Sequence, residues 1–514
     1  MTMRICCLFV VAATMLPSFA SAQDTDPLAL LKSIEAHYKK LIKRASPSVV
    51  AIANIEPANL RRPEEAVPNV RRIPIGDLRD LDDPSSPDFI PKQFGSGITI
   101  AHGENQAERS ILTNFHLVRG GVPVGATSSS EYHRIMVYFS DRRSAEARIL
   151  AGDPRSDLAV LKLTDSVHVN LNKQPGLTLA DASKVEKGES IVVLGNPYAI
   201  ARDGSASVSR GMVSNISRLP APPGAFNDPE AAAKTSIHHF GTLLHLDTRL
   251  NLGGSGGALL NLDGDLIGMT TSLAALEGYE KSVGFAVPFD QSIRRMILEE
   301  LCKGFEVEYG FLGIYPANVL SRDLQRMRLN IGQFAAAAAV DVARFSPAAM
   351  GRLQRDDLIL EINDRKILSR DDLMREIGIQ KPGTVSKLQI FRRGRGREYL
   401  YVTLGKWPVL ADEAIVATRQ RPERQFAGLT IDFPTARRKF SPEPLVYPEA
   451  VLVLNIEEGS PADDAGIEVG EFITHVNGAK VKTPDDFAKA ITDASNNKPV
   501  EFQFKDSRRV SLKP

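Results

Sequence analysis

The sequence has few cysteines, almost no net charge and no long hydrophobic run after its first residues. Three cysteines in 514 residues cannot form a disulfide framework. Lysine and arginine together number 63 and aspartate and glutamate 62, so the formal charge is +1, which argues against a dedicated nucleic-acid binder. The lack of long apolar runs excludes a polytopic membrane protein. A hydrophobic content of 43% excludes a wholly disordered chain, and the length predicts about three domains.

The first residues have the organisation of an export signal. A single basic residue is followed by an apolar stretch and by the small residues Ala20-Ser21-Ala22. The stretch is short for a spanning helix, so we predict a cleaved signal peptide over residues 1–22, with an uncleaved membrane anchor as the alternative. Two of the three cysteines would leave with this peptide, so the mature chain would keep only Cys302 and no intramolecular disulfide.

The rest of the chain divides by pattern. Residues 23–46 carry apolar positions at helical spacing and predict one amphipathic helix. From Phe94 to Val287, short apolar runs alternate with Gly, Asn, Asp and Pro, which is typical of an all-β barrel or sandwich. Residues 57–93 and 219–236 show neither helical nor strand spacing and are interpreted as long loop insertions.

The C-terminal part contains an internal repeat. Each copy has a Ser-Pro-Ala segment, then a strand-like run that ends in Asn, and then a Ser or Thr that can cap a helix whose first turn carries Asp. The serine of the first segment and the capping residue lie 23 residues apart in both copies. We therefore predict two copies of one mixed α and β module of roughly 95 residues. The matching residues are Ser346, Asn363 and Ser369 in the first copy and Ser460, Asn477 and Thr483 in the second.

The segment GGSGG around Ser255 contains the loose pattern G-x-S-x-G, which two classes of hydrolase share. In an α/β-hydrolase a helix follows the serine, and Asp and His come later in the chain. Here two apolar runs separated by a tight turn follow Ser255, and only His475, inside the second repeat, lies after it. The α/β-hydrolase interpretation is therefore the weaker one.

A chymotrypsin-type hydrolase has the order His, Asp, Ser, and the sequence offers all three in that order. His116 ends an apolar strand-like run, Asp157 lies just before another, and Ser255 lies on the glycine-rich loop. A serine hydroxyl becomes a strong nucleophile when a histidine removes its proton, and that histidine needs a carboxylate to orient it. Glycines let several backbone N–H groups turn toward one point, which makes an oxyanion site.

These motifs together indicate a family. The chain resembles the HtrA/Deg family of exported serine proteases through T-N-x-H-x-V at Thr113, S-D-L-A-V-L at Ser156, G-G-S-G-G-A-L at Gly253 and G-F-A-V-P at Gly284. The resemblance covers nearly the whole mature chain. It implies a mainly β fold, with a chymotrypsin-like double β-barrel protease domain followed by two α+β PDZ domains.

The resemblance also implies roles for individual residues. His116 would be the general base, Asp157 the residue that orients it, and Ser255 the nucleophile. The oxyanion hole would be built from the backbone of Gly253, Gly254 and Ser255; the family usually has Asn or Asp at the middle position, so we expect a more flexible loop here. The strand that pairs with substrate would consist of Thr270, Thr271, Ser272, Leu273 and Ala274.

The repeats resemble PDZ domains, which bind extended peptides by strand addition and hold a terminal carboxylate on backbone N–H groups. The first copy departs further from the pattern, because it has Arg352 and Asp356 where the second has Gly466 and Gly470. The implied carboxylate-binding loops are Phe311, Leu312, Gly313 and Ile314 in the first copy and Phe426, Ala427, Gly428 and Leu429 in the second.

Two further signals have simpler interpretations. Arginine alternates with glycine within residues 391–398, as in some nucleic-acid-binding segments, but strand-like runs on both sides predict a solvated hairpin turn. His238, His239 and His245 lack supporting cysteine or carboxylate ligands at metal-site spacing, so we predict no metal.

These features predict an exported, periplasmic, ATP-independent serine endopeptidase that degrades unfolded or damaged proteins without a cofactor. The alternative is a proteolytically weak or inactive relative that acts as a chaperone or scaffold. The family resemblance implies PDZ domains that bind peptide segments or C-termini, no nucleic-acid partner, and a homo-oligomer of three subunits or a multiple of three. The predicted segments are the signal peptide 1–22, an N-terminal helix 23–46, a protease domain 47–300 and PDZ domains over 306–406 and 420–514.

Overall fold

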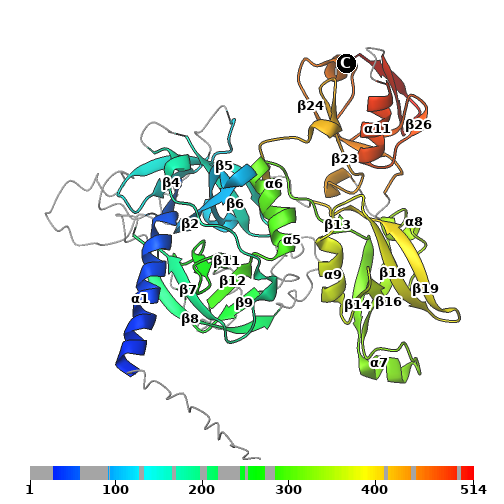
Figure 1. Cartoon of the computed structure of the whole chain (residues 1–514). Coiled ribbons are helices and arrows are strands. Elements are labelled where there is room, and N and C mark those ends of the chain that lie inside the picture. Colours follow the sequence, from blue (N-terminus) through cyan, green and yellow to red (C-terminus); the bar gives the residue numbers. More distant parts are fainter. Residues whose placement is uncertain are drawn as a thin grey trace, which may run out of the picture.

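A computed structural model of the chain shows two barrels of strands followed by two smaller sheet domains (Figure 1). Several predicted features lie outside the described residues: the signal peptide, nearly all of the insertion at 57–93, the insertion at 219–236, and Ser272, Leu273 and Ala274. The structure describes residues 27–57, 91, 93–126, 132–164, 169–196, 205–217, 243–248, 250, 253–271, 284–409, 415–440, 447–494 and 499–513.

Six strands close into a first barrel. Their order is β5-β4-β1-β2-β3-β6, and β5 also pairs with β6, which closes the ring. Branched aliphatic side chains such as Ile52, Ile111 and Val137 fill its interior, because they pack well on a pleated surface. The strands are β1 (Val49–Ile55), β2 (Gln93–His102), β3 (Glu108–Asn114), β4 (Arg134–Tyr138), β5 (Ser144–Asp153) and β6 (Leu158–Leu163).

Six more strands form a second closed barrel, so the predicted double β-barrel is confirmed. Their order is β10-β11-β12-β9-β8-β7, around a core that includes Ile191, Val213 and Leu259. Ser255 is followed by strand β10 and a tight turn, which contradicts the α/β-hydrolase alternative. The strands are β7 (Ser190–Gly195), β8 (Ser207–Ser217), β9 (Leu243–Leu246), β10 (Ala258–Leu260), β11 (Leu266–Thr271) and β12 (Gly284–Pro288).

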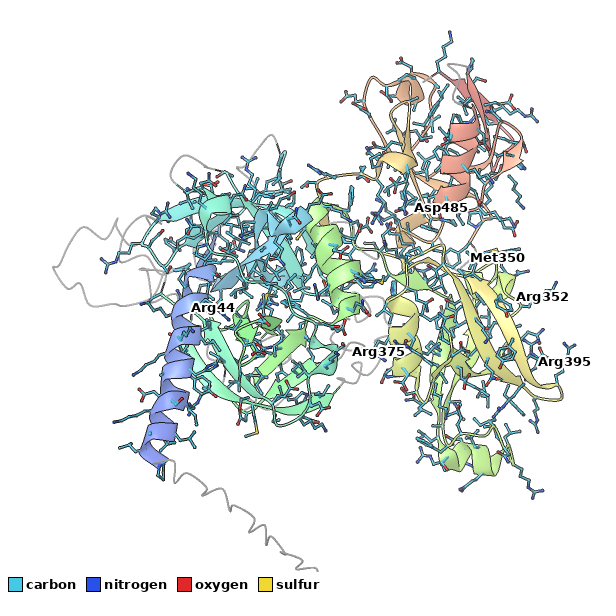
Figure 2. All side chains as sticks on the ribbon, viewed as in Figure 1. Arg44, Met350, Arg352, Arg375, Arg395 and Asp485 are labelled. Atoms are coloured by element: carbon cyan, nitrogen blue, oxygen red, sulfur yellow. The ribbon has the colours of Figure 1, made fainter. Side chains whose placement is uncertain are left out.

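A separate hydrophobic core fills the seam between the barrels. It contains Ile98 from the first barrel, Val192 and Leu260 from the second, Leu41 from the N-terminal helix and Leu298 from the helical segment after the second barrel. The N-terminal helix is also held by Arg44, labelled in Figure 2, which donates to the Asp263 carbonyl in the turn between β10 and β11. The helices are α1 (Pro27–Ala45), α5 (Gln291–Ile293), the π-helical turn η10 (Arg294–Leu298) and α6 (Glu299–Lys303).

The two repeats have the same strand topology. The first runs β14-β15-β16-β18-β19 and the second β23-β24-β25-β27-β28, with a short strand paired to the middle strand in each. The first contains β13 (Gly310–Phe311), β14 (Ile314–Val319), α7 (Ser321–Arg326), β15 (Ala336–Val342), α8 (Pro347–Met350), β16 (Leu358–Ile362), β17 (Arg365–Lys366), α9 (Arg370–Gly378), β18 (Val385–Arg392), β19 (Gly396–Thr403) and β20 (Gly405–Lys406). The second contains β22 (Gln425–Phe426), β23 (Leu429–Asp432), β24 (Val451–Ile456), α10 (Pro461–Asp464), β25 (Phe472–Val476), β26 (Ala479–Lys480), α11 (Pro484–Ala494), β27 (Val500–Phe504) and β28 (Arg509–Leu512).

Helix caps in the repeats follow the predicted pattern. Ser369 Oγ accepts the N–H of Asp372 at 3.0 Å, and Thr483 Oγ1 accepts that of Asp486 at 3.2 Å. These side chains satisfy backbone donors that have no partner inside the helix. Both repeats therefore start their main helix by the same local interaction.

The first repeat keeps the backbone path without the glycines of the second. Arg352 and Asp356 have φ values of +64° and +68°, close to the +67° of Gly466 and in the same left-handed region as Gly470. A residue with a side chain adopts this region at a cost of roughly 1–2 kcal/mol, which the surrounding fold must offset. The departure seen in the sequence thus changes side chains and not the fold.

The segment between β20 and β22, here called the connector (residues 407–424), returns to the first barrel. Its strand β21 (Val416–Ala417) pairs with β5, with Val416 opposite Gly152 and Ala417 opposite Ala151. The next residue, Thr418, donates its hydroxyl to the Leu150 carbonyl at 2.8 Å. The connector therefore adds a seventh strand, β21, to the sheet of the first barrel.

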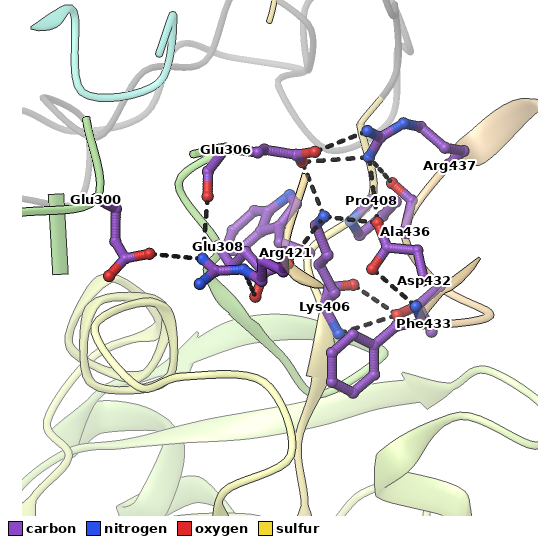
Figure 3. Close-up of polar contacts among 12 residues, drawn as sticks. Glu300, Glu306, Glu308, Lys406, Pro408, Arg421, Asp432, Phe433, Ala436 and Arg437 are labelled. Carbon is purple, nitrogen blue, oxygen red and sulfur yellow. Dashed lines mark hydrogen bonds and ion pairs between the residues drawn. The ribbon is translucent and has the colours of Figure 1, made fainter. Parts of the chain in front are cut away.

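A buried ion cluster joins α6, the linker between α6 and β13 (residues 304–309), strand β20 of the first repeat, the connector and the second repeat (Figure 3). At its centre the Lys406 side chain is 2% exposed, and its Nζ lies 2.9 Å from Glu306, 3.1 Å from Glu308 and 2.7 Å from Asp432. Four acidic and four basic residues balance in formal charge. The members are Glu300, Glu306, Glu308, Asp432, Lys406, Arg421, Arg424 and Arg437.

Removing the central cation tests whether this cluster holds the domains together. In Lys406→Met, three carboxylates lose a buried partner, which typically costs about 3–5 kcal/mol. We expect the variant to unfold at lower urea concentration, and its second repeat to be cut sooner in limited proteolysis. Lys387→Met, which removes an exposed ion pair with Asp364, is the control and should cost less than about 1 kcal/mol. Equal stability of the two variants would contradict the role of the cluster.

The cluster also predicts an acid dependence. Burial raises the pKa of Glu306, but Lys406 and Arg437 outweigh it and lower that pKa from 4.5 to about 2. A carboxyl whose folded pKa is depressed stabilises the fold above its unfolded pKa, and this contribution is lost as pH falls from 4.5 toward about 2. The free energy of unfolding of Glu306→Gln should therefore change less between about pH 5 and about pH 3 than that of the wild type. Parallel pH curves would contradict the assignment.

Candidate active site

His116 and Asp157 come from neighbouring elements of the first barrel. His116 lies on the short helix α2 (Phe115–Val118) directly after β3, and Asp157 ends the turn between β5 and β6. His116 Nδ1 lies 2.8 Å from Oδ2 and 3.0 Å from Oδ1 of Asp157, and the His116 backbone N–H donates to Oδ1 at 2.9 Å. One buried carboxylate thus fixes both the ring and the backbone of His116, and it leaves the other ring nitrogen for chemistry.

Asp157 has a backbone conformation that is rare for a residue with a side chain. Its φ is +53°, in the left-handed region. Its carbonyl accepts the N–H of Phe115 at 2.9 Å and the side-chain amide of Asn114 at 3.1 Å. Such strain persists only where the surrounding structure holds it. The turn from Asp153 to Asp157 is therefore a fixed support for the carboxylate.

Ser255 comes from the second barrel, on the loop before β10, and it is held by a residue of the first. The Ser96 N–H in β2 donates to the Ser255 carbonyl at 2.8 Å, and Ser96 Oγ donates to the Gly253 carbonyl at 2.9 Å. Ser96 Oγ also accepts the N–H of Asn196 at 2.7 Å. The position of the serine loop is thus set across the seam, next to the elements that carry His116 and Asp157.

Sequence reasoning missed Ser96, although a signal for it exists. It lies between two glycines, Gly95 and Gly97, in the buried part of strand β2. A Cβ at Gly95 would come within 2.3 Å of Leu117, and one at Gly97 within 2.7 Å of Ile52. The small triplet therefore marks a close approach, and a polar residue at its centre indicates a partner across that approach.

The peptide before Ser255 is oriented by β11. The Gly254 carbonyl accepts the Thr270 hydroxyl at 2.5 Å and the Gly257 N–H at 3.3 Å. Because C=O and N–H point in opposite directions in a trans peptide, the Ser255 N–H points away from Thr270. These bonds fix the loop through the backbone, without a side chain at position 254. The second predicted oxyanion donor, the Gly253 N–H, belongs to a peptide shared with residue 252, which lies outside the described part.

Thr270 and Thr271, predicted to pair with substrate, end strand β11. The Thr270 side chain faces the serine loop, as described above. Thr271 Oγ1 donates to Asp157 Oδ2 at 3.4 Å, so it links the second barrel to the carboxylate of the first. The structure thus gives both side chains supporting contacts, while their proposed backbone role with substrate stays a prediction.

The predicted carboxylate-binding loops have the same close contact in both repeats. Gly313 and Gly428 have φ values of +80° and +84°, and a Cβ there would lie 2.4 Å from Ser346 and 2.1 Å from Ser460. Only glycine fits such a loop. The sheet edges next to these loops differ, however. In the first repeat β14 is the edge strand, whereas in the second repeat β23 is paired with β22 on its outer side.

The remaining candidate signals have structural explanations. The arginine-glycine segment forms the β18–β19 hairpin, as predicted, with Arg395 on the outer side of the first repeat (Figure 2). His245 packs edge-on against Phe285, and burial lowers its pKa; His238 and His239 lie outside the described residues. No cluster of possible metal ligands and no helix long and apolar enough to cross a membrane occurs in the part of the chain that the structure describes.

Comparison with known proteins finds one peptidase domain and two PDZ domains in the chain. Residues 95–269 match the trypsin-like peptidase domain, and residues 310–400 and 452–506 match PDZ domains. A probable periplasmic serine endoprotease DegP-like of Pseudomonas putida is 27% identical over 513 residues, which cover 98% of this chain and 96% of the relative. A protein of the same name from Chlamydia pneumoniae is 26% identical over 494 residues, 94% of this chain and 91% of the relative.

A solved structure named "HtrA-type protease AlgW with tripeptide" has the same fold. Its TM-score is 0.50 at 23% identity, and the match covers 72% of this chain and 97% of that one. The matched domains, their order and the curated relatives agree with the resemblance seen in the sequence motifs. The chain is therefore a serine protease with a trypsin-like peptidase domain followed by two PDZ domains, and it is similar to proteins of the HtrA/Deg family.

Proposed function

We propose that the protein is an exported, ATP-independent endopeptidase that cleaves unfolded or damaged polypeptides with the triad His116, Asp157 and Ser255. The observation that carries the proposal is the bond of His116 Nδ1 to the buried Asp157 carboxylate at 2.8 Å. This pair lies at the seam where Ser96 of the first barrel holds the Ser255 loop of the second. The arrangement combines a nucleophile, a base and an orienting carboxylate.

The reaction follows from these positions. Ser255 Oγ attacks the peptide carbonyl while His116 Nε2 takes its proton, and Asp157 stabilises the imidazolium that forms. The N–H groups of Gly253 and Ser255 donate to the carbonyl oxygen as it becomes negative. The C–N bond then breaks, and His116 gives the proton to the leaving amine. Water repeats the sequence on the acyl-enzyme and releases the carboxylate product. No nucleotide takes part in any step.

An unfolded polypeptide is the substrate class that this site favours. Substrate would add as a strand along residues 270–274, and such main-chain pairing accepts many side chains. Only an extended chain exposes its backbone for this pairing, so a compact protein is a poor substrate. The solved HtrA-type protease with the same fold was determined with a tripeptide, which supports peptide binding as the proposed activity.

We assign the protease domain to residues 47–300 and the PDZ domains to residues 306–406 and 420–514. Their loops at Gly313 and Gly428 would hold peptide segments or C-termini. The free edge of β14 favours the first domain for strand addition, because β22 occupies part of the edge of β23. The signal-like N-terminus and the relatives' names support export to the periplasm, and the family resemblance supports a homo-oligomer built from trimers.

Cleavage of unfolded casein tests the activity. Ser255→Ala removes the nucleophile, so we expect the rate to fall by about 10⁴-fold or more while the protein stays folded. Product release is followed by gel or by fluorescence of labelled casein over a range of temperatures. If neither protein cleaves and both suppress aggregation of the substrate, the chaperone alternative replaces the protease.

A fluorophosphonate probe tests the roles of the triad. The probe should label Ser255 in the wild type and lose that labelling in His116→Ala, because the hydroxyl then has no base. His102→Ala, which changes a histidine of β2 that contacts Ser110, is the matched control and should keep the label. Equal labelling in all three proteins would contradict His116 as the base.

Gly256 offers a test of the loop geometry. Its φ is +80°, and a Cβ there would lie 1.9 Å from the Ser96 carbonyl oxygen, so Gly256→Ala must displace the serine loop. A displacement of about 1 Å typically costs about 10²-fold in kcat/KM. Gly188→Ala has a similar φ of +92° in open space and controls for backbone strain alone. Equal kcat/KM in the two variants would contradict this account.

A further inference from the structure

The turn that carries Asp157 also contacts the linker to the first PDZ domain. Its first residue, Asp153, is 2% exposed, and Oδ2 accepts both the Ser156 N–H at 2.9 Å and the Tyr309 hydroxyl at 2.5 Å. Tyr309 is 5% exposed and lies between the protease domain and β13. A residue outside the barrels thus completes the hydrogen bonding of the turn that supports the triad carboxylate.

A second contact brings the connector to the same turn. The Arg155 guanidinium lies over the Tyr309 ring, 5.2 Å from its centroid, and Nη2 donates to the carbonyls of Trp407 at 3.3 Å and Pro408 at 3.2 Å. The Trp407 N–H donates to the Tyr309 carbonyl at 2.7 Å. The linker and the connector are therefore bonded to each other and to the turn.

The connector also touches the strand that leads into this turn. β21 pairs with Ala151 and Gly152 of β5, immediately before Asp153. Both ends of the chain segment around the first PDZ domain thus meet the turn within a few residues of Asp157. The reaction scheme itself uses none of these contacts.

The bond between Tyr309 and Asp153 is strong because it is buried. A hydroxyl that donates to a carboxylate forms a short, charge-assisted bond. Burial, together with the charge of Asp153, raises the pKa of Tyr309 well above its usual value, so the hydroxyl stays a donor. Without the Tyr309 hydroxyl, Oδ2 of Asp153 would accept a hydrogen bond only from the Ser156 N–H. The turn would then be held by fewer hydrogen bonds. Asp157 has a strained φ of +53°, so its backbone would tend to leave this conformation.

We propose that Tyr309 is a positioning residue for catalysis: through Asp153 it holds the turn that presents Asp157 to His116. The linkers of both PDZ domains then take part in setting the geometry of the triad. The proposal rests on the catalytic roles given above. It adds that the triad is complete only while the linker and the connector are docked on the barrel.

Tyr309→Phe removes the hydroxyl and keeps the ring. The assay uses the full-length protein and a fluorogenic peptide whose sequence is taken from casein. We expect kcat to fall about threefold to tenfold and KM to stay unchanged, because no substrate contact is lost. Tyr399→Phe, on an exposed strand of the first PDZ domain, is the control and should leave both constants unchanged. Arg155→Met removes the donors to Trp407 and Pro408 and should lower kcat in the same way.

A spectroscopic readout separates positioning from a loss of stability. In the Ser255→Ala background, the low-field proton resonance of the His116 Nδ1–H bonded to Asp157 should move or broaden when Tyr309→Phe is added. This readout needs no proteolysis, so it decides the proposal even if the wild type fails to cleave casein and the proposed function falls. An unchanged resonance, or a lower kcat accompanied by a matching rise in KM, would overturn the positioning role.

Discussion

The hydrogen bonds of Ser96 join the two barrels at the loop that carries Ser255. Its N–H and hydroxyl reach across the seam to the loop of Ser255. Its carbonyl accepts the Thr113 hydroxyl at 2.7 Å, in the strand that leads to His116. One buried side chain and its peptide therefore connect the loop of Ser255 in one barrel to the strand that leads to His116 in the other. The hydrophobic core of the seam holds the barrels together, but it is not directional, and these bonds supply the register.

The domains beyond the barrels are placed by charge. The ion cluster around Lys406 is balanced in formal charge and largely buried, so its members stabilise one docked arrangement and oppose any that leaves a carboxylate without its cation. The linker residues Glu306 and Glu308 belong to this cluster, and Tyr309 follows directly after them. The same short segment thus fastens the PDZ domains and touches the turn of Asp157.

Local patterns in the sequence predicted a large part of this structure. The barrel strands, the helix caps at Ser369 and Thr483, and the His-Asp-Ser order all depend on residues close in the chain. Contacts between distant residues were not predictable in this way. Ser96 and Gly253 lie 157 positions apart, and Tyr309 and Asp153 156. The expectation of a flexible loop at Gly254 considered only the missing side chain, whereas the Gly254 carbonyl is bonded to Thr270. The function of Ser272, Leu273 and Ala274 stays a prediction.

The pairing of β21 with β5 has a consequence for how such a chain can be rearranged in evolution. The first PDZ domain is enclosed by two stretches of chain that belong to the barrel, so it behaves as an insertion rather than as an appended module. Recombination at the end of this domain, after Lys406, would separate β5 from its seventh strand and Glu306 from Arg437. Exchange of PDZ domains between relatives is therefore expected to succeed only when the paired residues come from the same parent, β5 with β21 and Glu306 with Arg437.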